Sequence, residues 1–86
     1  MADKIAKNRF SDIEFGQAIG VTDEGTINFS RAHSAAPTTV IAVNGYNSDR
    51  FVSPYDMTSS GFKVFVKSTS WQPASSWINW VAIWGG

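Results

Sequence analysis

Few side chains of this sequence have the type and spacing for chemistry, and two acids are the first to consider. Asp12 and Glu14 lie two residues apart in a segment with a strand-like pattern, so both point to one face. Carboxylates paired in this way could act as acid and base on a glycoside, or could hold calcium. No further acid flanks the pair and no glycine-bracketed calcium loop follows it. We therefore expect both acids to have a structural role.

Nucleophilic and metal chemistry has still less support. His33 stands in a polar connection with no Cys or Asp near it in sequence, and we expect it on the surface. No serine has the setting of a nucleophile elbow. The chain has no cysteine, which excludes disulfides and thiolate metal sites. We expect no catalytic residues, no metal and no cofactor.

A polar cluster in the middle of the chain has a different potential. Asn47, Ser48 and Asp49 directly precede Arg50, and together they are candidates for recognising hydroxyl groups. Arginine suits such a role because its planar fork bonds two oxygen atoms at once. The alternative is that Arg50 pairs with Asp49 or Asp56 as a structural clamp.

The segments that position these residues have the pattern of short strands. Apolar and polar residues alternate from Asp12 to Ile19, and similar stretches cover 26–30, 38–43, 50–55, 62–67 and 77–84. The run 38–43 is apolar on both sides, which places it centrally or at an interface, whereas Pro54 favours an edge or a bulge. Six such strands predict an all-β, six-stranded antiparallel β-sandwich or a barrel. We expect residues 12–86 to form this domain and residues 1–11 to be a lead segment or linker.

Composition narrows the function classes. Seven basic and seven acidic side chains cancel, so the basic excess of a nucleic-acid-binding protein is missing. No apolar run is long enough to cross a bilayer, and we expect no membrane insertion. Four Trp, six Phe and two Tyr are more than one small core can hold, which indicates a subunit interface or a ligand platform.

The last strand-like segment, 77–84, is apolar on both faces. One face carries Ile78, Trp80, Ala82 and Trp84, and the other carries Asn79, Val81 and Ile83. A single small domain has only one core to cover a strand, so the second face is expected to meet another subunit.

Several motifs together resemble the H-type lectin family. Glu14-Phe15-Gly16 is similar to its opening strand, and Ile27-Asn28-Phe29 with Pro37 to Val43 to its next strands. Gly61-Phe62 followed by a strand, Trp71, and Trp80-Val81-Ala82-Ile83 correspond to its "TGF" turn, loop tryptophan and closing strand. The resemblance covers about Glu14 to Trp84. It implies an antiparallel sandwich that forms a homotrimer, with sugar held between protomers, and very similar domains form the tips of bacteriophage tail fibres.

The resemblance also implies binding residues. Arg50 corresponds to an arginine that bonds the sugar, and Trp71 to the loop tryptophan, whose ring would cover the C–H face of a pyranose. Gln72 stands where the family has histidine, which removes one expected contact. Trp77 corresponds to a further aromatic in a loop of different length.

Asp23 and Glu24 lie where the family supplies a sugar-binding acid; the alternative is a solvated turn. The expected function is a lectin-like module that binds a surface glycan or a host cell-surface receptor, located on a virion or outside a cell. The alternatives are a trimerisation or capping element of a viral fibre without a ligand, a protein-binding receptor, and a small glycan hydrolase.

Overall fold

The computed structural model describes residues 10–45 and 49–85, and in these the predicted all-β character is confirmed. The strands are β1 (Phe10–Thr22), β2 (Gly25–Asn28), β3 (Thr39–Asn44), β4 (Arg50–Tyr55), β5 (Gly61–Ser68) and β6 (Ser75–Gly85). None of the described residues belongs to a helix that could span a membrane. β1 begins at Phe10, slightly before the predicted boundary, and residues 1–9 of the predicted lead segment lie outside the described residues.

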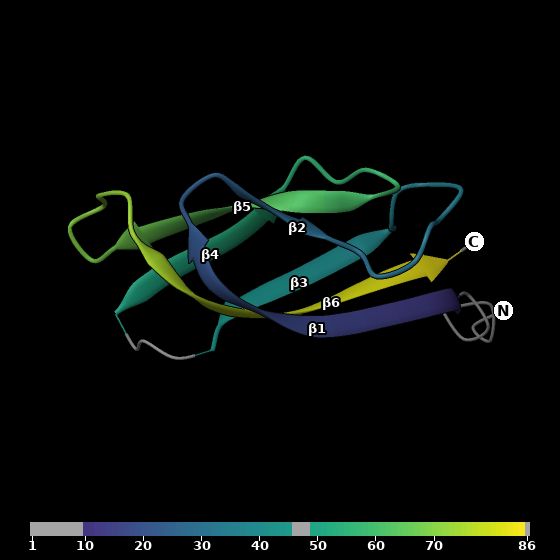
Figure 1. The fold of residues 1–86 in the computed structure, drawn as a ribbon, viewed down its shortest axis with the longest axis horizontal. Helices are drawn as coiled ribbons and strands as arrows, with labels where there is room; N and C mark the ends of the chain where they lie inside the picture. The colour runs from purple at the N-terminus through teal and green to yellow at the C-terminus, as the bar shows by residue number, and fades with distance from the viewer. Residues whose placement is uncertain (1–9, 46–48, 86) are drawn as a thin grey trace, which may run out of the picture.

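The strands form two three-stranded antiparallel sheets, shown as two layers in Figure 1. Sheet A has the order β1-β6-β3, and sheet B has the order β2-β5-β4. β4 lies at an edge, as Pro54 predicted, because proline has no backbone N–H and cannot donate a ladder hydrogen bond to a further strand. β3 is also an edge strand, so a central position for 38–43 is wrong.

The core lies between the two sheets and is built by alternation. Val64 and Val66 of β5 and Ile78 and Ala82 of β6 are fully buried, and Trp80 packs among them. One of the two apolar faces of β6 was predicted to fill the sandwich, and it is the face that carries these residues. At the start of β5, a Cβ on Gly61 would lie 2.3 Å from the carbonyl oxygen of Ile27, so only glycine allows β2 and β5 to approach this closely.

β1 is oriented with its more polar face toward the core. Its inward residues include Glu14, Gly16 and Ala18, while Ile13 and Phe15 point outward. A Cβ at Gly16 would lie 3.1 Å from the Trp80 ring, so a larger residue there would require the ring to shift by a few tenths of an ångström. The bulky indole of Trp80 therefore takes the space that an apolar side chain of β1 would otherwise fill.

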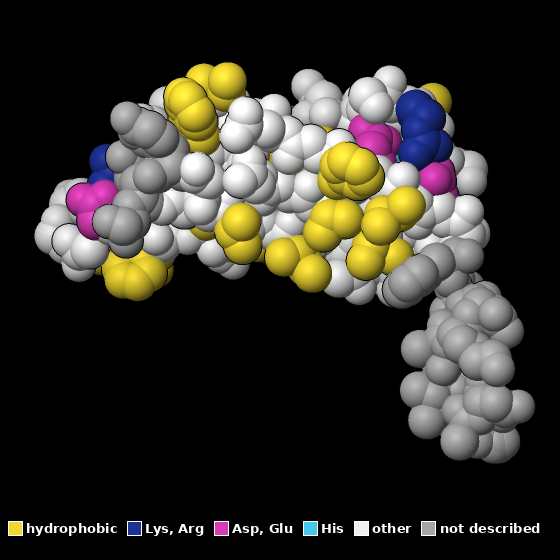
Figure 2. All heavy atoms as spheres, turned by 90° about the horizontal axis from the view of Figure 1, so that it is seen from below, with side chains coloured by type: hydrophobic (Ala, Val, Ile, Leu, Met, Phe, Trp, Pro, Cys, Tyr) yellow, Lys and Arg dark blue, Asp and Glu magenta, His cyan; other side chains and the backbone are white. Residues whose placement is uncertain are grey.

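The outer face of sheet A, here called the apolar face, is exposed. Phe15, which is 75% exposed, is paired through the backbone with Val81, and Val81 with Ile41 on the far strand. The other apolar residues of this face are Ile13, Ile19, Val43 and Ile83. Figure 2, seen from the side where β1 and β6 lie in Figure 1, shows apolar side chains gathered in its middle and charged ones toward its ends.

The start of the first strand, β1, lies beside the end of the last strand, β6. Phe10 at the start of β1 pairs with Gly85 at the end of β6, and the ladder continues to Thr22 and Ser75. This ladder is the longest in the described part of the fold, and one register shift in it lies between Ala18 and Val21.

Candidate functional site

A groove of about 480 Å³ lies on the outer face of sheet B. Its lining residues come from β4, β5 and the loop that follows β5: Phe51, Val52, Ser53, Phe65, Lys67 and Trp71. The antiparallel register sets Phe51 opposite Lys67 and Ser53 opposite Phe65, so two strands supply the floor of what we call the aromatic groove. Most of this lining is apolar, with a few polar groups, which is the usual character of a small-molecule site.

Trp71 is held over the groove by a tight turn. The Trp71 N–H donates to the Ser68 carbonyl at 2.9 Å, and the Ser68 N–H donates to the Gln72 carbonyl at 2.9 Å. Trp71 has φ 64°, a left-handed conformation that is rare for a bulky side chain and concentrates at functional sites. The residue is 63% exposed, and its ring centroid lies 5.6 Å from that of Phe51.

Two further rings extend the aromatic surface along sheet B. Tyr55 stacks on Phe65 with centroids 4.0 Å apart and planes 10° apart. The Lys67 ammonium lies 5.8 Å from the Phe65 centroid. Burial raises the pKa of Tyr55, and the nearby acids, Glu24 foremost, raise it further. The Tyr55 hydroxyl therefore keeps its proton at neutral pH.

Asp23 is paired inside the protein and so lacks the solvated position of the alternative, while its contact with a sugar stays a prediction. Its carboxylate accepts from the Lys67 ammonium at 2.7 Å and from the Val66 N–H at 2.8 Å, and its side chain is nearly buried. The Lys67 bond is the main reason that the pKa of Asp23 is lowered. Asp23, which does not line the groove itself, thus holds the groove residue Lys67 in place. Its neighbour Glu24 is exposed in the turn.

Arg50 is a clamp in this structure and does not line the groove. Its guanidinium donates to the Ser75 carbonyl at 3.0 Å and pairs with the Asp49 carboxylate at 2.9 Å. The pairing with Asp49 confirms one of the two predicted clamps; Asp56 instead lies 3.9 Å from the Lys63 ammonium.

The other predicted residues lie apart from the groove lining. Gln72 takes part in the turn that holds Trp71, and its side chain is exposed. Trp77 is a residue of β6 in sheet A, 37% exposed, and so belongs to the other layer. Asn47 and Ser48 lie outside the described residues. Phe51, Phe65 and Lys67 were missed, although their period-two spacing in two neighbouring strands could have identified them.

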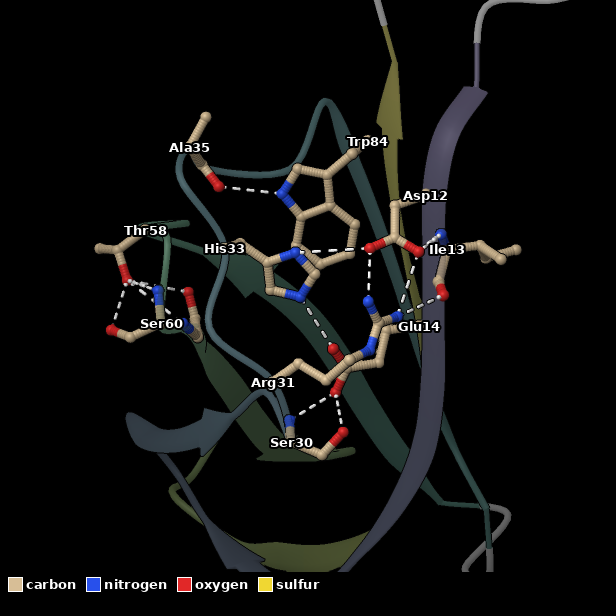
Figure 3. A network of polar contacts seen from close by, with 11 residues as sticks. Asp12, Ile13, Glu14, Ser30, Arg31, His33, Ala35, Thr58, Ser60 and Trp84 are labelled. Atoms are coloured by element: carbon tan, nitrogen blue, oxygen red, sulfur yellow. Dashed lines mark hydrogen bonds and ion pairs between the residues drawn. The ribbon is translucent and has the colours of Figure 1, made fainter.

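A second polar arrangement, the acid–histidine network, joins β1 to the segment after β2 (Figure 3). Glu14 is 7% exposed, and one of its carboxylate oxygens lies 2.9 Å from Nε2 of His33. The other oxygen accepts from the Ser30 hydroxyl at 2.7 Å and from the Ser30 N–H. Asp12 pairs with the Arg31 guanidinium at 2.6 Å.

The prediction that His33 lies on the surface is wrong. Its side chain is 6% exposed and stacks on Trp84 with centroids 3.7 Å apart and planes 7° apart. Nδ1 of His33 lies 3.7 Å from the Asp12 carboxylate. The acids that surround the ring are distant in sequence, and the fold brings β1 beside the segment that carries His33. The Trp84 indole N–H also donates to the Ala35 carbonyl at 2.9 Å, which fixes the same segment.

The pairing within the network lowers the pKa of both acids. Burial would raise the pKa of Glu14, but the hydrogen bonds from His33 and Ser30 outweigh it and lower the pKa. The hydrogen bond from Arg31 lowers the pKa of Asp12. Both ring nitrogens of His33 face carboxylates, and no hydroxyl nucleophile is bonded to the ring in the described network. The described residues also contain no group of three or more His, Cys, Asp or Glu that could hold a metal ion.

The chain was compared with family models, curated proteins and solved structures, and no match was found in any of the three.

Proposed function

We propose that this chain is a carbohydrate-binding module that attaches a larger assembly, such as a phage tail fibre, to glycans on a cell surface. The observation that carries the proposal is the aromatic groove, with Trp71 held in a strained turn above Phe51. The module carries out no chemistry on its ligand in this proposal, and its location is the virion or the extracellular space.

The groove has the groups that a pyranose needs. Aromatic rings cover the apolar C–H side of a sugar, while hydroxyl groups seek donors and acceptors at the rim. Phe51 and Trp71 supply the rings, and the Ser53 hydroxyl and Lys67 ammonium are the polar groups of the lining. A strained but fixed Trp71 loses little freedom when the ligand binds, which favours affinity.

The apolar face supports the second part of the proposal, which is a homotrimer. Isoleucine, valine and phenylalanine side chains are exposed together on sheet A, and large exposed apolar patches mark interaction sites. Burying this face between copies would leave the aromatic groove on the opposite sheet available. Several weak sugar sites on one assembly would gain affinity from their high effective concentration.

A glycan array tests the proposal with the wild type and the Trp71→Ala variant. We expect signals from the wild type and their loss in the variant, with an unchanged circular dichroism spectrum and sedimentation coefficient. Trp77→Ala is the matched control, because it removes an exposed tryptophan from the other sheet. Binding that survives Trp71→Ala and is lost with Trp77→Ala would contradict the proposed site.

A structural trimerisation or capping element without a ligand is the second candidate function, and the apolar face favours it. This function requires the apolar face alone. A blank array obtained with folded, assembled protein would support it and would refute glycan binding.

A further inference from the structure

The charges around the aromatic groove restrict its ligand, if the proposed function holds. We propose that the groove is a complete site within one chain for an uncharged sugar, and that it discriminates against acidic sugars such as uronic or sialic acids.

The only charged residue in the groove lining is already paired inside the protein. The Lys67 ammonium lies 2.7 Å from the Asp23 carboxylate, and both side chains are largely buried. Asp23 is also bonded by the Val66 N–H, so its position is fixed independently of Lys67. The lowered pKa of Asp23 keeps this acid ionised at neutral pH. The positive charge that an acidic sugar would need is therefore balanced before any ligand arrives.

The neighbouring cations of sheet B are compensated as well. Lys63 lies 3.9 Å from the Asp56 carboxylate, and Arg50 lies 2.9 Å from that of Asp49. With Lys67, these are the basic residues in the described strands of sheet B. An acidic sugar would bring a second carboxylate to an ammonium whose charge Asp23 already balances. The two anions would repel each other, and a Lys67 that turned fully to the sugar would leave a nearly buried carboxylate without its counter-ion, which is a costly arrangement.

A neutral sugar meets no such penalty. An ammonium group has three N–H donors, and the bond to Asp23 uses one of them. Lys67 can therefore donate to a sugar hydroxyl while it remains paired, and the Ser53 hydroxyl can donate or accept nearby. The rings of Phe51 and Trp71 would cover the C–H face of the same sugar.

All lining residues of the groove come from β4, β5 and the turn after β5 of the same chain. The apolar face proposed for self-association lies on sheet A, the other layer. A chain separated from its copies therefore keeps every group of the groove. This differs from the sugar clefts between protomers that the resemblance to H-type lectins implies.

The first experiment uses an array of neutral oligosaccharides and their sialylated or glucuronic-acid-bearing counterparts. We expect signals from neutral probes, and we expect their affinity to change less than about twofold between about 0.05 and 0.5 M NaCl, because salt screens only charge interactions. Signals confined to acidic probes and lost at high salt would overturn the inference while leaving glycan binding intact. A blank array would refute the proposed function itself.

The second experiment changes the charge balance. Asp23→Asn leaves Lys67 without its counter-ion, and we expect the acidic counterpart of the best neutral probe to gain at least about tenfold in affinity, as a newly uncompensated cation would allow. Asp49→Asn is the control, because it frees a cation outside the groove lining. If Asp23→Asn does not fold, the salt dependence of the wild-type affinity for neutral and acidic probes, from the first experiment, is the test of the inference. No gain in a folded Asp23→Asn variant would overturn the inference.

The third experiment tests whether one chain is sufficient. Phe15→Lys places a charge on the apolar face to prevent self-association. We expect the soluble neutral probe to bind with unchanged affinity per chain, measured by tryptophan fluorescence, while binding to a dense glycan surface weakens. If the variant is a folded monomer that no longer binds the soluble probe, the site needs a second chain and the inference is overturned.

Discussion

Replacing Glu14 with glutamine tests the energetics of the acid–histidine network. The carboxylate accepts three hydrogen bonds, two from Ser30 and one involving His33. Hydrogen bonds to a charged group contribute about 1 kcal/mol more than neutral ones, so Glu14→Gln loses roughly 3 kcal/mol over three bonds. We therefore expect a decrease of about 2–4 kcal/mol in the free energy of unfolding at neutral pH. This is a large share of the total, since the free energy of unfolding of a domain is about 5–15 kcal/mol.

The pH dependence of this effect has a definite sign. The pKa of Glu14 is lowered in the folded state from its ordinary value of 4.5, so its contribution to stability is present above that pH. The contribution is lost as the pH falls through the lowered folded-state pKa. The difference between the wild type and Glu14→Gln should therefore shrink as the pH falls below 4.5 and through the lowered folded-state pKa, because the wild-type carboxyl then becomes protonated as well.

Urea unfolding followed by tryptophan fluorescence measures both quantities, at one fixed protein concentration because self-association would add to the apparent stability. Asp12→Asn is the control, since it changes an acid that pairs with Arg31 nearer the surface, and we expect a smaller effect. A Glu14→Gln variant within about 0.5 kcal/mol of the wild type at neutral pH, or a difference that stays constant with pH, would refute the reasoning.

Three further substitutions test the core, the close contact between β2 and β5, and the apolar face. Ile78→Ala removes a fully buried side chain and should lower the free energy of unfolding by about 2–5 kcal/mol in urea; a loss below about 1 kcal/mol would mean that the site collapses around the gap. Gly61→Ala places a Cβ against the carbonyl of Ile27 and should lower the melting temperature clearly, whereas an unchanged value would show that β2 can move aside. Phe15→Lys should abolish self-association in analytical ultracentrifugation without changing the circular dichroism spectrum, and a wild type that is already monomeric would remove the homotrimer from the proposal.

Local patterns predicted the elements of the fold well. The alternation in β6 identified its two apolar faces, one of which fills the core, and Pro54 indicated that β4 is an edge strand, because both signals act within a few residues. β1 shows the limit of such patterns. Its more apolar face points outward, since Gly16 makes room for Trp80 and Glu14 finds bonding partners inside.

The candidate site was predicted only in part, because its residues meet across strands. Trp71 was identified and lies in the groove, whereas Phe51 and Lys67 become neighbours only through the pairing of β4 with β5. His33 was misplaced for the same reason, since the carboxylate beside it is 19 residues away. Sequence spacing shows which residues share a strand face, but not which strand lies beside it.

The pairing of Phe10 with Gly85 affects how this domain responds to mechanical force. Because the two ends of the described chain leave at the same end of the β1–β6 ladder, a pull that separates them loads the first hydrogen bonds of the ladder alone. The ladder would then open one bond at a time, as a zipper does, and offer little resistance. A load applied between one end and a ligand on sheet B would also pass through the core between the two sheets, and so would not act on the first bonds of this ladder alone.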